Sequence, residues 1–136
     1  SRISVKENPR NREIFDVPDN EETLFAIASD PEATRTSVQI IYKQDVQTKG
    51  SFDDHRREIV EELYNSMLSQ RLSELTKKPN APFLYGYSYQ GQFWSRSKSM
   101  YLLGAGVTED GVQEGLEALL IEAERVSRFG CTETDL

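Results

Sequence analysis

The chain contains 136 residues, with 16 basic and 23 acidic side chains that give a formal net charge of −7. This charge repels polyphosphate and no basic patch stands out, so nucleic acid is excluded as a partner. A lone cysteine excludes an internal disulfide, and no apolar run approaches the ~20 residues that a membrane span needs. A domain of this length buries roughly two-thirds of its unfolded surface, which is enough for a hydrophobic core.

Residues 1–21 are predicted to form an extended connector, because they carry two prolines and scattered charges. A single domain is then predicted over residues 22–136. Its first strand would be residues 23–28, which are apolar on both alternating faces, as in a strand covered from both sides. Asp30 and Pro31 end this strand, since proline cannot donate a ladder hydrogen bond.

Residues 36–43 alternate between apolar and polar side chains, which predicts a half-buried strand. Residues 51–78 show the strongest helical pattern, with Ser51 and Asp54 placed as a capping box and Pro79 as the stop. Apolar residues recur through this helix at steps of three and four: Val60, Leu63, Tyr64, Met67, Leu68, Leu72 and Leu75.

Residues 83–89 and 98–107 predict an antiparallel hairpin, joined by a loop over residues 91–97. A second amphipathic helix is predicted over residues 109–129, with Gly130 as the residue that follows its end. Its inner stripe comprises Val112, Leu116, Leu119, Leu120, Ala123 and Val126.

Thr132 and Asp135 have the spacing of a capping box, so we expect a third helix that the chain enters and that is truncated there. The order strand-strand-helix-strand-strand-helix predicts the α+β class. The expected architecture is a two-layer sandwich, in which a mostly antiparallel sheet carries both helices on one face.

His55 is the only histidine in the chain. The sequence from His55 to Ile59 superficially matches the H-x-x-E-H zinc motif, but Ile59 stands where the second imidazole is required. Helical geometry places His55 away from the apolar stripe, so a solvated histidine is expected.

Arg71 lies inside the apolar stripe of the first helix, where a charge needs a partner. The favoured interpretation is an arginine that pairs with Glu74 or with a carboxylate at the end of the sheet. Contact with a substrate carbonyl is the alternative.

Phe83, Tyr85, Tyr87 and Tyr89 are expected to share one face of a strand. Such a stripe is more often core or interdomain packing, but tyrosines also suit a peptide-binding surface. Tyr85, Tyr87 and Arg71 are therefore the candidate substrate-contact or interdomain residues. No catalytic residue is predicted, because the lone Cys131 has no histidine near it in sequence. No metal-ligating residue is predicted either, because His55 lacks the second histidine of the zinc motif.

Several short segments, taken in order, resemble the pitrilysin/insulinase family of zinc metallopeptidases. They are residues 29–34, 42–43, 67–75, 81–84, 124–126 and 130–133. More narrowly, the chain is similar to the non-catalytic domain that follows the zinc-bearing domain in long bacterial members.

The resemblance implies a fold shared with mitochondrial processing peptidase, in which homologous α+β domains form a clamshell around the substrate peptide. Zinc and the catalytic glutamate would belong to another domain of the parent chain, and this segment would need no cofactor of its own. Family members often carry the dipeptide Leu-Arg after the first helix and a tyrosine shortly after this dipeptide. In some members the arginine and the tyrosine together bind the substrate backbone. Here Thr76 follows Leu75, and only Tyr85 fits the tyrosine position.

The predicted function is a non-catalytic, zinc-less domain of a zinc metalloendopeptidase that forms part of the clamshell wall. Its expected partners are the other domains of the parent chain and a peptide substrate. The alternative is a non-proteolytic assembly or scaffold domain of the same fold. For the compartment, a bacterial cell envelope or periplasm is the favoured interpretation, and the cytoplasm is the alternative.

Overall fold

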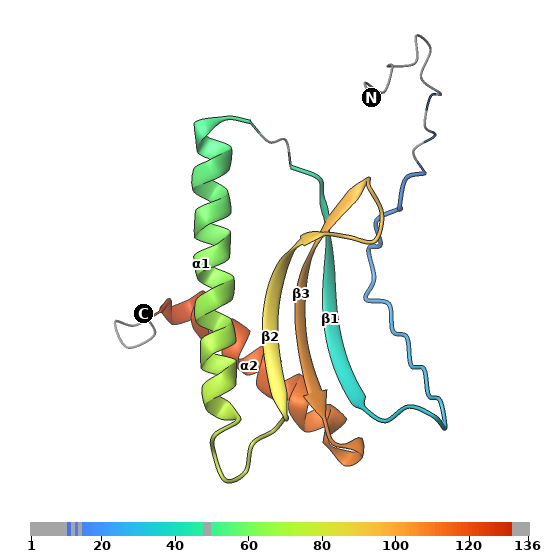
Figure 1. Ribbon diagram of the computed structural model, residues 1–136, viewed down its shortest axis with the longest axis vertical. Helices are drawn as coiled ribbons and strands as arrows, with labels where there is room; N and C mark the ends of the chain where they lie inside the picture. Colours follow the sequence, from blue (N-terminus) through green and yellow to red (C-terminus); the bar gives the residue numbers. More distant parts are fainter. Residues whose placement is uncertain (1–10, 12, 14, 48–49, 132–136) are drawn as a thin grey trace, which may run out of the picture.

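The computed structural model describes residues 11, 13, 15–47 and 50–131. In chain order these form β1 (Thr36–Asp45), α1 (Phe52–Leu75), β2 (Tyr85–Gln92), β3 (Lys98–Val107) and α2 (Val112–Phe129). A short 3-10 turn, Glu109–Gly111, leads into α2. The strands form one antiparallel sheet in the order β1-β3-β2, which confirms the α+β class (Figure 1).

The central strand, β3, has the same bounds as the strand predicted over residues 98–107. It pairs along its whole length with β1 and, from Ser99 to Gly106, with β2. Because side chains alternate along a strand, its odd-numbered and even-numbered residues lie on opposite faces of the sheet. The buried core contains the odd-numbered Leu103, Ala105 and Val107.

Both helices pack on this odd-numbered face, as predicted (Figure 1). α1 contributes Leu68 and Leu72 to the core, and α2 contributes Leu119 and Val126. However, only part of the apolar stripe of each helix is buried. Val60 and Leu63 are more than half exposed, because α2 passes the C-terminal half of α1 and does not cover the N-terminal half (Figure 1).

α1 begins with the predicted capping box. The Ser51 hydroxyl accepts a hydrogen bond from the backbone N–H of Asp54, and the Asp54 carboxylate accepts one from the Ser51 backbone. The helix ends at Leu75, three residues earlier than predicted. There the Thr76 hydroxyl donates to the Ser73 carbonyl, and tight turns at Lys77 and Lys78 replace the helical hydrogen bonds.

The hairpin differs from the prediction at both ends of β2. This strand starts at Tyr85 rather than at residue 83 and runs on to Gln92, so the connecting loop shortens to residues 93–97. At the far end of the chain, Gly130 adopts a φ of 68° and donates its N–H to the Val126 carbonyl, as expected of a residue that ends a helix. The third helix, predicted from Thr132, lies outside the described residues.

The strand predicted over residues 23–28 is wrong. These residues are extended but belong to no strand, and the side chains of Leu24, Phe25 and Ile27 are 74%, 87% and 98% exposed. An apolar pattern on both faces calls for cover from both sides, and none of the described residues supplies it. In the view of Figure 1 the segment lies beyond β1, on the side away from β3, and β1 is an edge strand of the described sheet.

Candidate functional site

Three tyrosines of β2 lie on the sheet face opposite the helices. Cross-strand pairing places Tyr85 beside Gly106, Tyr87 beside Gly104 and Tyr89 beside Leu102, all on the even-numbered face of β3. Tyr85 and Tyr89 are each 46% exposed, and Tyr87 is partly buried. We call the surface formed by Tyr85, Tyr87 and Tyr89 the tyrosine face.

Glycines allow these rings to lie flat on the sheet. A Cβ atom at Gly106 would lie 2.2 Å from Cε1 of Tyr85, and one at Gly104 would lie 2.7 Å from Cζ of Tyr87. Tyr89 covers Gly91 in the same way, at 2.1 Å from its hydroxyl oxygen. Any side chain at these positions would occupy the space of a ring, so the glycines fix where the rings rest.

The tyrosine rings are also held sideways. Tyr85 and Tyr87 stack, with ring centroids 6.5 Å apart and planes inclined by 21°. Gln39 lies on β1, across β3 from Tyr87 and on the same face of the sheet, and its Nε2 donates a hydrogen bond to the Tyr87 hydroxyl over 3.1 Å. The result is a preformed aromatic surface with polar tips, a combination that suits contact with an extended peptide or another domain.

Phe83 does not share this face, contrary to the prediction. Its ring is buried in the core and lies next to Leu72 and Gly86. The strict alternation of side chains applies only within a strand, and β2 begins at Tyr85. Phe83 therefore turns toward the helices while the tyrosines turn away from them.

Arg71 lies on the helix side, so the structure does not bring it together with Tyr85 and Tyr87. Its Nε donates to Glu122 Oε2 of α2 over 3.0 Å, and the two side chains are 13% and 11% exposed. Arg125 adds a second cation 3.7 Å from the same carboxylate. The predicted carboxylate partner exists, but it comes from α2 rather than from Glu74 or the sheet.

A polar network that the sequence does not predict connects α1 with the sheet. Ser69 bonds both the N–H and the carbonyl of Ser88, which satisfies backbone groups on the outer edge of β2. The Ser88 hydroxyl donates to Asn65 Oδ1 over 2.5 Å, and the Tyr64 and Tyr101 hydroxyls lie 3.3 Å apart. Burial, with help from the Tyr101 hydroxyl, raises the pKa of Tyr64. No local sequence pattern signals such a network.

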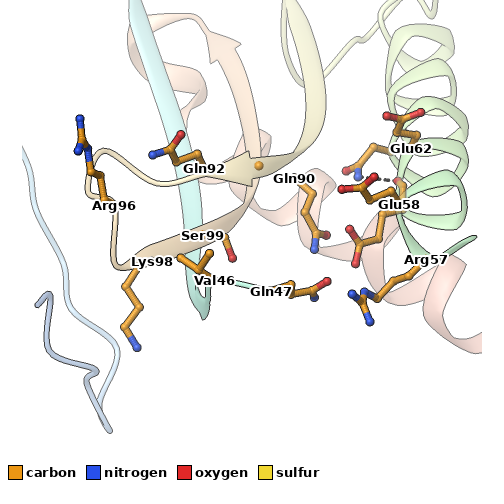
Figure 2. A pocket seen from close by; sticks show the side chains of 13 residues that line it. Val46, Gln47, Arg57, Glu58, Glu62, Gln90, Gln92, Arg96, Lys98 and Ser99 are labelled. Atoms are coloured by element: carbon orange, nitrogen blue, oxygen red, sulfur yellow. Dashed lines mark hydrogen bonds between the residues drawn. The ribbon is translucent and has the colours of Figure 1, made fainter. Parts of the chain in front are cut away.

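A cleft of about 420 Å³ separates the first half of α1 from the end of the β2–β3 hairpin (Figure 2). Glu58 and Glu62 of α1 point into it opposite Gln90 of β2 (Figure 2). His55 stands nearby but is 71% exposed, with its Nδ1 3.9 Å from Glu58. Within the described residues, no group of three or more His, Cys, Asp or Glu side chains could hold a metal ion.

Trp94 and Cys131 do not extend the site. Trp94 is mostly exposed and meets the ring of Phe93 edge to face, with the ring centroids 4.8 Å apart. Cys131 is partly buried and packs against the core.

Comparison with known proteins gives one partial similarity. The chain is 33% identical over 70 residues to a protein of Arabidopsis thaliana described as "Zinc protease PQQL-like". The similar region covers 52% of this chain but only 7% of that protein. No family model matches the chain, and no solved structure matches it.

This similarity to a zinc protease-like protein is compatible with a domain of the pitrilysin type.

Among the described residues, no helix is long and apolar enough to cross a membrane.

Proposed function

We propose that this chain is a non-catalytic, zinc-less domain of a zinc metalloendopeptidase. In this role, the tyrosine face forms part of the wall that encloses the peptide substrate. The observation that carries the proposal is the 33% identity to a zinc protease-like protein over half of the chain. The preformed tyrosine face supplies a surface suited to peptide contact.

The residues described here do not fit a zinc site. His55 has one carboxylate near it, at 3.9 Å, whereas zinc needs three or four ligands at about 2.0–2.3 Å. The zinc would therefore be bound by another domain of the parent chain, where it would polarise a water molecule for attack on the peptide bond. The tyrosine face would hold the substrate and exclude bulk water.

Steady-state kinetics of the complete protein test this proposal. Tyr85→Ala and Tyr87→Ala are expected to raise KM for a peptide substrate about five- to tenfold, because truncating a central aromatic contact costs over ~1 kcal/mol. kcat and bound zinc should change little. Tyr42→Ala is the matched control, since Tyr42 is an exposed tyrosine of β1 on the helix side of the sheet.

Unchanged KM in both tyrosine variants would contradict the substrate-contact role. A complete protein that binds no zinc and hydrolyses no peptide would contradict the enzymatic parent. That second result would favour the scaffold function instead.

A further inference from the structure

Residues 15–19, which we call the lead-in segment, contact the β2–β3 hairpin at Ser97 and Lys98 and contact β1 at Lys43. The backbone N–H of Val17 donates to Ser97 Oγ over 3.3 Å, and Ser97 Oγ lies 3.4 Å from the Phe15 carbonyl. Lys43 Nζ donates to the Pro18 carbonyl. Three successive contacts therefore engage backbone groups of an extended segment, as a protein engages a bound peptide.

The fourth contact of the lead-in segment is made through an acidic side chain. Asp19 Oδ2 lies 2.9 Å from Lys98 Nζ, and Lys98 is only 6% exposed although it carries a charge. Asp45 also bonds Lys98, at 2.8 Å. The hydrogen bond from Lys98, with the positive charges of Lys98 and Lys43, lowers the pKa of Asp19. Figure 2 shows Lys98 pointing away from the cleft toward this segment.

Two of the groups that hold the lead-in segment, Lys43 and Lys98, lie on the same side of the sheet as the tyrosine face. Lys43 pairs with Met100 across the β1–β3 ladder, and Lys98 pairs with Asp45. Both lysines therefore share the even-numbered face with Tyr85 and Tyr87. A peptide lying along the tyrosines could continue directly into this region.

Apolar burial does not account for the position of the lead-in segment. Its largest side chain, Phe15, is 79% exposed. Its contacts described above are hydrogen bonds to backbone groups and one ion pair, and any extended peptide with an acidic residue at the matching position could make them. The sheet and hairpin therefore contact the lead-in segment through its backbone groups and through one acidic side chain.

We propose that Lys43, Ser97 and Lys98 form a binding subsite for an extended acidic peptide, and that the lead-in segment occupies this subsite within the same chain. The inference rests on the proposed function, because it identifies the class of peptide that the tyrosine face receives. The lead-in segment then acts as a built-in competitor that an acidic substrate must displace.

The test uses a fluorescent peptide with the sequence of residues 15–20 of this chain, and its binding to the 136-residue chain is followed by anisotropy. Binding to the unaltered chain should be weak, because a tethered segment competes at an effective concentration of about millimolar. Asp19→Ala in the chain removes the acidic anchor of the tethered segment. The peptide is then expected to bind about tenfold more tightly, since a hydrogen bond to a charged group is lost only from the competitor.

Three chain variants and one altered peptide identify the subsite. In the Asp19→Ala chain, adding Ser97→Ala or Lys43→Met should weaken peptide binding about tenfold, whereas adding Lys77→Met, an exposed lysine beyond the end of α1, should not. A peptide with asparagine in place of its second aspartate should also bind about tenfold more weakly. Lys98 is left unaltered because its burial would confound folding with binding.

Absence of peptide binding to the Asp19→Ala chain would overturn the subsite, as would equal binding of the asparagine peptide. These results are independent of the proposed function, because they require neither zinc nor hydrolysis. If the peptide binds as expected while KM is unchanged in the tyrosine variants of the complete protein, the subsite stands and the proposed role of the tyrosine face fails.

Discussion

At the residue scale, the tyrosine face depends on the absence of side chains beneath its rings. The ring of Tyr85 takes the space that a Cβ atom at Gly106 would fill. The pair therefore behaves as one unit, in which the glycine supplies room and the tyrosine supplies surface.

We predict that Gly106→Ala lowers the free energy of unfolding by about 1 kcal/mol and displaces the Tyr85 ring outward. The cost is modest because the ring is half exposed and can move. In a Tyr85→Ala background the same glycine substitution should cost almost nothing. Urea unfolding of the four proteins measures this coupling, and strictly additive effects would contradict the packing described here.

The carboxylate of Asp54 at the start of α1 has a pH-dependent role. Hydrogen bonds from the hydroxyl and backbone N–H of Ser51, and then from Arg57, lower the pKa of Asp54 to about 2. Because this folded-state pKa lies below the unfolded value of ~3.9, the stabilisation is fully present above pH ~4 and is lost as the pH falls through 2.

Asp54→Asn should therefore reduce the urea midpoint at pH 6, and the difference from the unaltered chain should shrink between pH 4 and 2. Asp19 also has a lowered pKa, but it is present in both proteins and cancels in the comparison. A difference that stays constant down to pH 2 would show that the carboxylate has no such role.

At the element scale, the pair formed by Arg71 and Glu122 joins the two helices. Arg71→Met would leave the buried Glu122 carboxylate with only the more distant Arg125 as a cation among the described residues, so we expect a loss of about 3 kcal/mol in the free energy of unfolding. The control is Glu124→Gln, which breaks the exposed pair with Arg128 and should cost less than ~1 kcal/mol. Equal, small effects of the two substitutions would contradict a structural role for Arg71.

Elements whose signals are local could be predicted from the sequence. The capping box at Ser51 and the run of strand residues from Lys98 to Val107 each lie within a few neighbouring positions, and both were found where expected. The strand predicted over residues 23–28 does not form. Its apolar pattern indicates that a strand there would need cover on both faces, but the pattern does not show whether other parts of the chain supply that cover.

The candidate site was predictable only in part. Tyr85 and Tyr87 were singled out as strand aromatics, but their glycine partners come from β3 and their exposure depends on which face the helices cover. The bond between Lys98 and Asp19 joins residues 79 positions apart, so no sequence window contains both. Phe83 lies two residues before the start of β2, so the alternation of side chains along that strand does not determine which way its ring points.

At the scale of the whole molecule, one face of the sheet carries both described helices, and the other face carries neither of them. Besides the tyrosine face, the exposed Phe25 and Ile27 add apolar surface outside the core. We therefore predict that the chain self-associates at high concentration. Analytical ultracentrifugation across a concentration series measures this, and Phe25→Ser with Ile27→Ser should weaken it. A strictly monomeric chain at high concentration would contradict the prediction.

The most direct test of the proposed zinc-less character is metal analysis of the 136-residue chain after zinc loading and extensive dialysis. We predict far less than one zinc ion per chain, with no change on His55→Ala, because His55 is exposed and has no convergent set of ligands among the described residues. About one tightly held zinc ion per chain, lost on His55→Ala, would contradict the account.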